Sequence, residues 1–124
     1  MDSSQTYSHV FVYRIPKRNH KSLLELQEKL RAIYKRHGML SSRIYQLGNS
    51  NVFEGFEGFD KVLGTKSDEE IWIEVDSYEN ASEFARIVAD IGRDAAAGPL
   101  WGELAKLTSD HPVVMGEFEL LARV

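Results

Sequence analysis

Cysteine is the first thing missing from this sequence: none of the 124 residues is one. This absence excludes disulfides, thiolate zinc sites, iron–sulfur clusters and cysteine nucleophiles. A chain that forms no disulfide suits a reducing compartment, and we expect the protein to lie in the cytoplasm.

Long apolar runs and an excess of basic charge are missing as well. No apolar run approaches the roughly 20 residues that a helix needs to cross a bilayer. The start, MDSSQTYSHVF, has no basic region followed by an apolar one, so we expect no secretory signal. The formal net charge of −4 argues against a nucleic-acid partner, which needs a basic surface. We therefore expect neither a membrane nor a nucleic acid as partner.

Signatures of metal or cofactor chemistry are also missing. The four histidines, His9, His20, His37 and His111, do not show the spacing of a metal site such as HxxxH. None of Gly55, Gly58 and Gly64 directly precedes a Lys-Ser pair, as a phosphate-binding loop requires, and their spacing differs from that of a dinucleotide turn. We expect no metal and no cofactor, and no catalytic residue is identified by a motif.

The chain does have the composition of one soluble domain. Hydrophobic residues make up 43% and charged residues 27%, which are ordinary values for a globular protein. Residues 1–7 are small and polar, and we expect them to be frayed. A single domain is expected over residues 8–124.

The first half predicts a strand and then a helix. Ser8 to Ile15 is rich in β-branched and aromatic residues, and Pro16 ends that strand. An amphipathic helix follows from about Asn19, and Gly38 after a basic turn is a typical stop signal. The apolar face of this helix recurs every three or four residues: Leu23, Leu26, Leu30, Ile33, Tyr34 and His37.

The second half predicts two strands, a helix and a last strand. In order, we expect a strand over Leu40–Gly48, an irregular segment over Asn49–Asp68, a strand over Glu69–Asp76, a helix capped by Asp76 or Ser77, a short helix over residues 100–107 and a strand over residues 113–124. This order predicts an α+β domain of the ferredoxin-like βαββαβ type. Its four-stranded antiparallel sheet would carry two helices on one face and leave the other face open.

The strand EEIWIEVD alternates cleanly and suggests how the two faces divide. We expect Ile71, Ile73 and Val75 to face the helices, which puts Trp72 and Glu74 on the open face. Alternation in the other strands adds further candidates, so the predicted open-face set is His9, Phe11, Tyr13, Arg43, Tyr45, Trp72, Glu74 and Glu117.

A face that mixes aromatic and charged side chains fits a half-buried cavity or an interface. We expect homodimerisation through the sheet face, with a small molecule as a possible further partner. Arg43, Glu74 and Glu117 have two interpretations. They orient a polar ligand, with Glu74 as proton acceptor if burial raises its pKa, or they form a salt-bridge network in the dimer interface.

The stretch FEGFEGFD, residues 53–60, places a phenylalanine at every third position, namely Phe53, Phe56 and Phe59. The acids between them are also three apart, unlike the alternate-position acids of a calcium loop. Three-residue spacing suits a short helical turn that stacks the rings on one side. We expect the rings to be buried against the sheet rim or a partner subunit, as a lid or a dimer contact.

Four segments together resemble a known family: VYRIPKRN, RHGML, KSDEEIWIEVDSY and GEFELL. Their order and spacing, from His9 to Leu121, are similar to those of a widespread bacterial family of uncharacterised proteins in the dimeric α/β-barrel superfamily. The resemblance implies a ferredoxin-like subunit that pairs through its sheet. In that family an acid and a glycine usually stand where this chain has His9 and Val10.

The wider superfamily includes cofactor-free monooxygenases that act on polyketide-like quinols, haem-degrading enzymes and chlorite dismutases. Trp72 matches one member of the asparagine–tryptophan–histidine set of the haem-degrading relatives, but no histidine is suitably placed on the following helix. We therefore expect a homodimeric protein that binds a small ligand between the open sheet face and residues 49–68. The alternative is a cofactor-free monooxygenase-like enzyme acting on an aromatic or quinol substrate.

Overall fold

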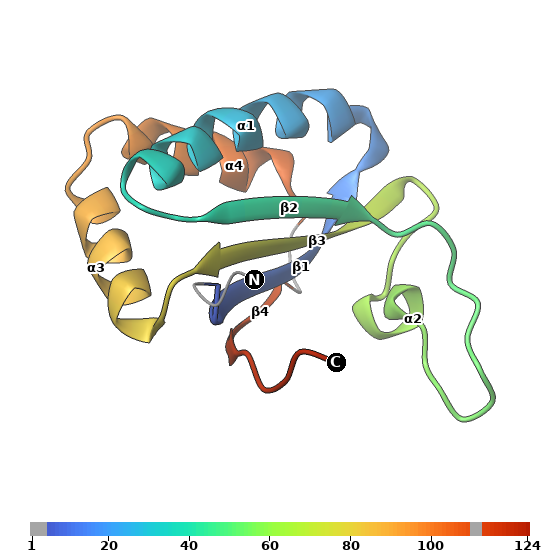
Figure 1. Ribbon diagram of the computed structural model, residues 1–124. Helices are drawn as coiled ribbons and strands as arrows, with labels where there is room; N and C mark the ends of the chain where they lie inside the picture. Colours follow the sequence, from blue (N-terminus) through green and yellow to red (C-terminus); the bar gives the residue numbers. More distant parts are fainter. Residues whose placement is uncertain (1–4, 110–112) are drawn as a thin grey trace.

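The fold is built on one four-stranded antiparallel sheet. The computed structural model describes residues 5–109 and 113–124. Its strands, β1 (Tyr7–Pro16), β2 (Ser41–Gln46), β3 (Glu69–Tyr78) and β4 (Val114–Glu119), are arranged in the order β2-β3-β1-β4. This order places β1 and β3 in the centre and confirms the ferredoxin-like α+β fold (Figure 1).

Two of the helices cover one face of this sheet (Figure 1). After a 3-10 turn, η1 (Lys17–Asn19), come α1 (His20–Arg36), α2 (Phe59–Leu63), α3 (Ala81–Gly92) and α4 (Ala97–Leu107). Figure 1 shows α1 and α4 above the sheet, α3 at one end of it, and α2 on the opposite side. No helix within residues 5–109 and 113–124 is long and apolar enough to cross a membrane.

Helix α1 follows the predicted pattern closely. Its apolar stripe buries Leu23, Leu26 and Leu30 completely or nearly so. The helix ends at Arg36, and Gly38 takes a φ of +120°, a conformation that glycine adopts without steric cost. The predicted glycine stop is therefore confirmed.

Two predicted boundaries were wrong. Strand β3 runs on to Tyr78, so Asp76 and Ser77 lie within it and cannot cap α3. The cap is Asn80, whose side-chain Oδ1 accepts a hydrogen bond from the Glu83 backbone N–H at 2.8 Å. Helix α4 begins at Ala97 rather than at residue 100, because a proline in the first turn of a helix forfeits no intrahelical hydrogen bond.

The two ends of the domain also differ in detail from the expectation. Strand β1 begins at Tyr7, inside the segment expected to be frayed, and Leu120 donates its backbone N–H to the Thr6 carbonyl at 2.8 Å. Residues 1–4 and His111 lie outside the described residues.

The predicted assignment of the sheet faces was wrong. In the register, Tyr13 lies opposite Trp72, Phe11 opposite Glu74 and His9 opposite Asp76, so these six side chains share one face. That face is the one under α1, whose Gln27 and Arg31 contact Glu74. Ile71, Ile73 and Val75 therefore face away from the helices. Paired charges from α1 make the burial of Glu74 and Asp76 tolerable, which the aliphatic pattern alone does not reveal.

The predicted open-face cluster is consequently divided. Arg43 lies opposite Val75 and Tyr45 opposite Ile73, so both are on the open face as predicted. Glu117 lies opposite His9 and shares the helix-side face with the aromatic residues of β1. Of the three charged candidates, Arg43 therefore lies on the open face, whereas Glu74 and Glu117 lie on the helix-side face.

We expect Asn80→Ala to lower the free energy of unfolding by about 1 kcal/mol, because the Glu83 N–H loses its only side-chain acceptor at the helix start. Urea unfolding followed by circular dichroism measures this change. Asn80→Asp keeps a capping oxygen and should be close to wild type. Equal losses in the two variants would contradict the capping role.

Candidate functional site

A cavity of about 250 Å³ lies between the sheet and the two helices that cover it. Its walls come from β1, β3, α1 and α4, with two further residues between α4 and β4. The lining residues are Phe11, Tyr13, Gln27, Arg31, Glu74, Trp101, Leu104, Ala105, Thr108 and Val113. Trp101 is 41% exposed, so the cavity opens to solvent along α4.

The polar end of the cavity is organised around Glu74, which is only 2% exposed. The Gln27 side chain donates from Nε2 to Glu74 Oε1 at 3.0 Å and to the Tyr13 hydroxyl at 3.2 Å. The Tyr13 hydroxyl in turn donates to the same Glu74 oxygen at 3.4 Å. Side chains from β1 and α1 thus meet at one carboxyl group of β3.

Arg31 of α1 lies between two carboxylates of β3. Its Nη1 is 2.9 Å from Glu74 Oε2 and also forms an ion pair with Asp76. The Ser42 hydroxyl donates to the other oxygen of Asp76 at 2.6 Å. One buried cation therefore faces two buried carboxyl groups, so their charges balance when one of the two carries a proton.

Glu74 is the group that holds this proton. Burial raises the pKa of Glu74 to about 8, and the favourable charge of Arg31 only partly opposes this. Burial also raises the pKa of Tyr13 above its ordinary value, with the neighbouring Glu74 adding to the effect. A carboxyl group with a pKa near neutrality can donate or accept a proton at physiological pH.

Several buried polar atoms around the cavity have no hydrogen-bond partner within the described residues. They are Glu74 Oε2, Gln27 Oε1 and Arg31 Nε; Oε2 lies near Arg31 without the geometry of a hydrogen bond. An unpaired buried polar group costs about 1–3 kcal/mol, so native proteins usually satisfy it with a partner. All three residues line the cavity, and a polar atom of a bound molecule is a suitable partner.

The predicted site residues are distributed unevenly around this cavity. Phe11, Tyr13 and Glu74 line it. Trp72 lies on the same face, with its ring centroid 6.3 Å from that of Tyr13, but its indole N–H donates to Glu70 at 3.0 Å.

His9 and Glu117 lie further along β1 and β4. The His9 ring is 4.2 Å from that of Phe11, and burial lowers the pKa of His9. Glu117 accepts a hydrogen bond from the Tyr7 hydroxyl, which raises the pKa of Tyr7. Neither His9 nor Glu117 lines the cavity.

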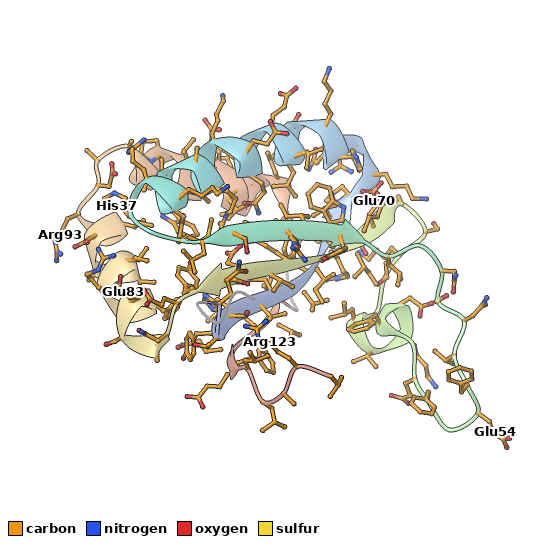
Figure 2. All side chains as sticks on the ribbon, in the orientation of Figure 1. His37, Glu54, Glu70, Glu83, Arg93 and Arg123 are labelled. Carbon is orange, nitrogen blue, oxygen red and sulfur yellow. The ribbon has the colours of Figure 1, made fainter. Side chains whose placement is uncertain are left out.

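The phenylalanines of FEGFEGFD also lie away from the cavity. Phe53, Phe56 and Phe59 are 81%, 67% and 53% exposed, so the expected burial against the rim of the protomer's own sheet was wrong. Gly55 adopts a positive φ in a turn that projects from the sheet, and Figure 2 shows Glu54 at its outer tip. The predicted residues thus fall into three groups: the cavity, the open face and this turn.

Sequence reasoning missed Gln27, Arg31 and Trp101. A signal for the first two was present, because both fall inside the apolar stripe of α1, four residues after Leu23 and Gln27 respectively. Polar residues inside such a stripe indicate a buried polar partner on the facing element. Trp101 was assigned to a short helix, but nothing in its spacing linked that helix to the sheet.

Metal-binding groups do not gather around this cavity. Across residues 5–109 and 113–124, no three His, Asp or Glu side chains are placed to hold a metal ion.

Solved structures share this fold at low sequence identity. A dimeric ferredoxin-like protein from an uncultured marine organism superposes with a TM-score of 0.66 and 9% identity, covering 99% of this chain and 95% of its own. A conserved protein from Methanosarcina mazei gives 0.64 and 9%, covering 96% of each chain. A monooxygenase of Streptomyces coelicolor in complex with nanaomycin D gives 0.61 and 15%, covering 99% and 94%.

These similarities show the fold that the sequence resemblance implied, a ferredoxin-like subunit, and at such identities they show the fold alone. No protein-family model matches the sequence, and a search of curated proteins gave no match.

We expect Glu74→Gln to change how stability depends on pH. Glu74 has a folded pKa raised from 4.5 to about 8, so the folded state holds its proton more tightly than the unfolded state. The contribution of Glu74 is fully present below the unfolded pKa and is lost as pH rises toward 8. Urea unfolding at pH 5 and pH 8.5 should show a difference smaller by roughly 1–3 kcal/mol in Glu74→Gln than in wild type. An identical difference in both proteins would contradict a protonated Glu74.

A second expectation concerns Arg31. Arg31→Met leaves two buried carboxyl groups without their cation and should lower the free energy of unfolding by roughly 3–5 kcal/mol. Adding Glu74→Gln removes one of the two and should recover part of the loss. Chemical denaturation of the two variants measures the coupling, and strict additivity would contradict the triad.

Proposed function

We propose that the protein binds a small planar aromatic molecule in the cavity beneath α1 and α4. The observation that carries the proposal is a buried carboxyl group, with the unpartnered Oε1 of the buried Gln27 beside it, at the polar end of a mostly apolar cavity. Apolar walls with a few convergent polar groups are the usual features of a ligand site. The expected ligand position between the open face and residues 49–68 is less favoured. The groove there, which Val12, Phe59 and Ile73 help to line, has no ionisable lining residue.

The dimensions and chemistry of the cavity narrow the ligand class. A volume of about 250 Å³ lies below the roughly 300 Å³ typical of sites for drug-sized ligands, which favours one or two fused rings. Phe11 and Trp101 offer ring faces, and Gln27 and Glu74 offer an acceptor and a proton. A phenolic hydroxyl or a quinone carbonyl matches these groups.

We also propose a homodimer that forms through the open sheet face. That face presents Val10, Val12, Ile73 and Val75, none of which is fully buried in the protomer. Two of the solved structures with this fold are described as dimeric ferredoxin-like proteins. Pairing of the two aliphatic faces removes apolar surface from water, which is the usual driving force for such association.

A cofactor-free oxygenase acting on a quinol is the second candidate function. Glu74 favours it, since a carboxyl group with a pKa of about 8 is ionised as the pH rises past this value, and its ionised form can take a phenolic proton and so activate an electron-rich ring. Structures that share the fold include a putative antibiotic biosynthesis monooxygenase from Nitrosomonas europaea and a cofactor-independent oxygenase from Streptomyces nogalater. The oxygenase would use the same cavity, with the same lining residues, as the ligand-binding proposal.

Ligand binding is tested with 2-naphthol as probe and the fluorescence of Trp101 as readout. We expect saturable quenching, because Trp101 lines the cavity mouth. Ala105→Phe narrows that mouth and should weaken binding at least about tenfold. The matched control is Ala89→Phe, on the exposed side of α3, which should bind as wild type does. Equal affinity in all three proteins would reject the cavity as the site.

The oxygenase is tested by oxygen uptake with 1,4-naphthohydroquinone. We expect a rate above that of the buffer, falling by roughly 10²-fold or more in Glu74→Gln if Glu74 is the base. A rate equal to that of the buffer would reject the enzyme while leaving the binding proposal to the titration.

A further inference from the structure

The segment that follows β2 exposes several large apolar side chains to solvent. We define the Phe arm as residues 49–63, which include the FEGFEGFD stretch and α2. Phe53 and Phe56 pack against each other, edge to face with centroids 5.9 Å apart, and remain 81% and 67% exposed. Exposed aromatic clusters of this kind mark interaction sites.

The arm lies beside the open face of the sheet. A groove of about 230 Å³ runs between Phe59 and the open-face side chains of Val12, Ile71 and Ile73. Figure 1 shows α2 on the side of the sheet opposite α1 and α4. The arm is therefore continuous with the surface through which we propose dimerisation.

A second exposed apolar surface lies on the same side. It belongs to β4 and the residues after it, where Phe118 is 57% and Leu121 98% exposed. Phe118 lies opposite Ser8 in the register and so projects from the open face. In Figure 1 the chain after β4 runs below the sheet, on the side where α2 lies. We call residues 118–124 the tail.

The register places the arm and the tail at opposite ends of the sheet. The arm follows Gln46, which pairs with Trp72 and through it lies level with Tyr13. The tail begins where β4 ends, and there Glu119 pairs with Tyr7 at the other end of β1. The order β2-β3-β1-β4 also places arm and tail at opposite edges, so they occupy opposite corners of the sheet. A two-fold axis diagonal to the strands, between two open faces that cross at nearly a right angle, brings the arm of each copy to the tail of the other.

Charge favours this arrangement over arm against arm. The arm carries Glu54, Glu57 and Asp60 with Lys61 as its only cation, so two arms in contact would repel each other. The tail carries one cation, Arg123, and one acid, Glu119, which lies opposite Tyr7 and so projects from the helix-side face. Figure 2 shows Arg123 below the sheet, well separated from Glu54 within one protomer. Contact between arm and tail thus joins apolar to apolar and acidic to basic surface.

We propose that the Phe arm of each protomer packs on the tail of a second copy of this chain, Phe53 and Phe56 against Phe118 and Leu121, with Glu54 or Glu57 beside Arg123. The inference rests on the homodimer proposed above and adds the contact that fixes its orientation. In the dimer, each arm thus contacts the tail of the partner subunit at one corner of the stacked sheets.

The absence of native cysteine permits a clean cross-linking test. Two differently tagged chains, one carrying Phe53→Cys and the other Leu121→Cys, are mixed, allowed to exchange subunits and oxidised gently. We expect a covalent product that contains both tags. The matched control replaces Leu121→Cys with Leu24→Cys, on the exposed side of α1, which should give at least about tenfold less mixed product if contact decides the yield.

The outcomes separate the two proposals. A wild-type protein that is monomeric in analytical ultracentrifugation overturns both the dimer and the arm contact. A wild-type dimer in which Phe53→Cys cross-links mainly to itself, or equally to Leu24→Cys and Leu121→Cys, overturns the arm contact and leaves the dimer standing.

A charge exchange provides the second measurement. Glu54→Arg with Glu57→Arg should weaken dimerisation roughly tenfold through repulsion from Arg123, and adding Arg123→Glu should restore it. Phe53→Ser with Phe56→Ser should weaken it further, because the apolar contact is lost. If circular dichroism shows that both arm variants are folded, unchanged dimerisation in both would overturn the contact.

Discussion

A single buried guanidinium group, that of Arg31, determines how this domain is assembled. It is 8% exposed and lies between Glu74 and Asp76, which are 2% and 1% exposed. A buried carboxylate without a partner is prohibitively costly, so the face of β3 that carries these two side chains can lie beneath α1 only because α1 supplies Arg31. The orientation of the sheet, and with it the position of every alternate side chain, follows from this constraint.

The same constraint creates the chemistry of the cavity. One cation cannot balance two carboxylates, and the excess charge is removed by a proton on Glu74. Gln27 and Tyr13 hold that carboxyl group in place from a helix and a neighbouring strand. Hydrophobic replacements for such a buried cluster often stabilise a protein, so retaining the cluster carries a cost in stability that ligand binding would explain.

Local sequence patterns were sufficient for the fold but not for the site. Strand β3 shows why, because its aliphatic residues Ile71, Ile73 and Val75 alternate with Trp72, Glu74 and Asp76 in a pattern that fits either orientation. Hydrophobicity favoured the wrong one. The information that decides between them lies about forty residues earlier, in Gln27 and Arg31 within the apolar stripe of α1, and only the pairing of α1 with β3 makes it readable.

Gly38 and Pro16 could be interpreted from the sequence, whereas the phenylalanines of the arm could not. Gly38 and the break at Pro16 depend on backbone conformation alone, so their meaning could be predicted from their immediate neighbours. The phenylalanines of the arm depend on a surface outside the arm. Their three-residue spacing predicted a turn, and Phe56 does donate its backbone N–H to the Phe53 carbonyl at 3.0 Å, but spacing does not identify what covers the rings.

Strand β3 links the two proposed functions of the molecule because its residues alternate between them. Glu74 belongs to the cavity, while Ile73 and Val75 on either side of it belong to the proposed dimer face. A rigid partner sheet against Ile73 and Val75 restricts the backbone that positions the Glu74 carboxyl group. Since proton transfer and hydrogen bonding depend on donor–acceptor distances of roughly 3 Å, restricting this strand preserves the geometry of the site. Dimerisation through the open face would therefore stabilise the cavity without contributing a residue to it.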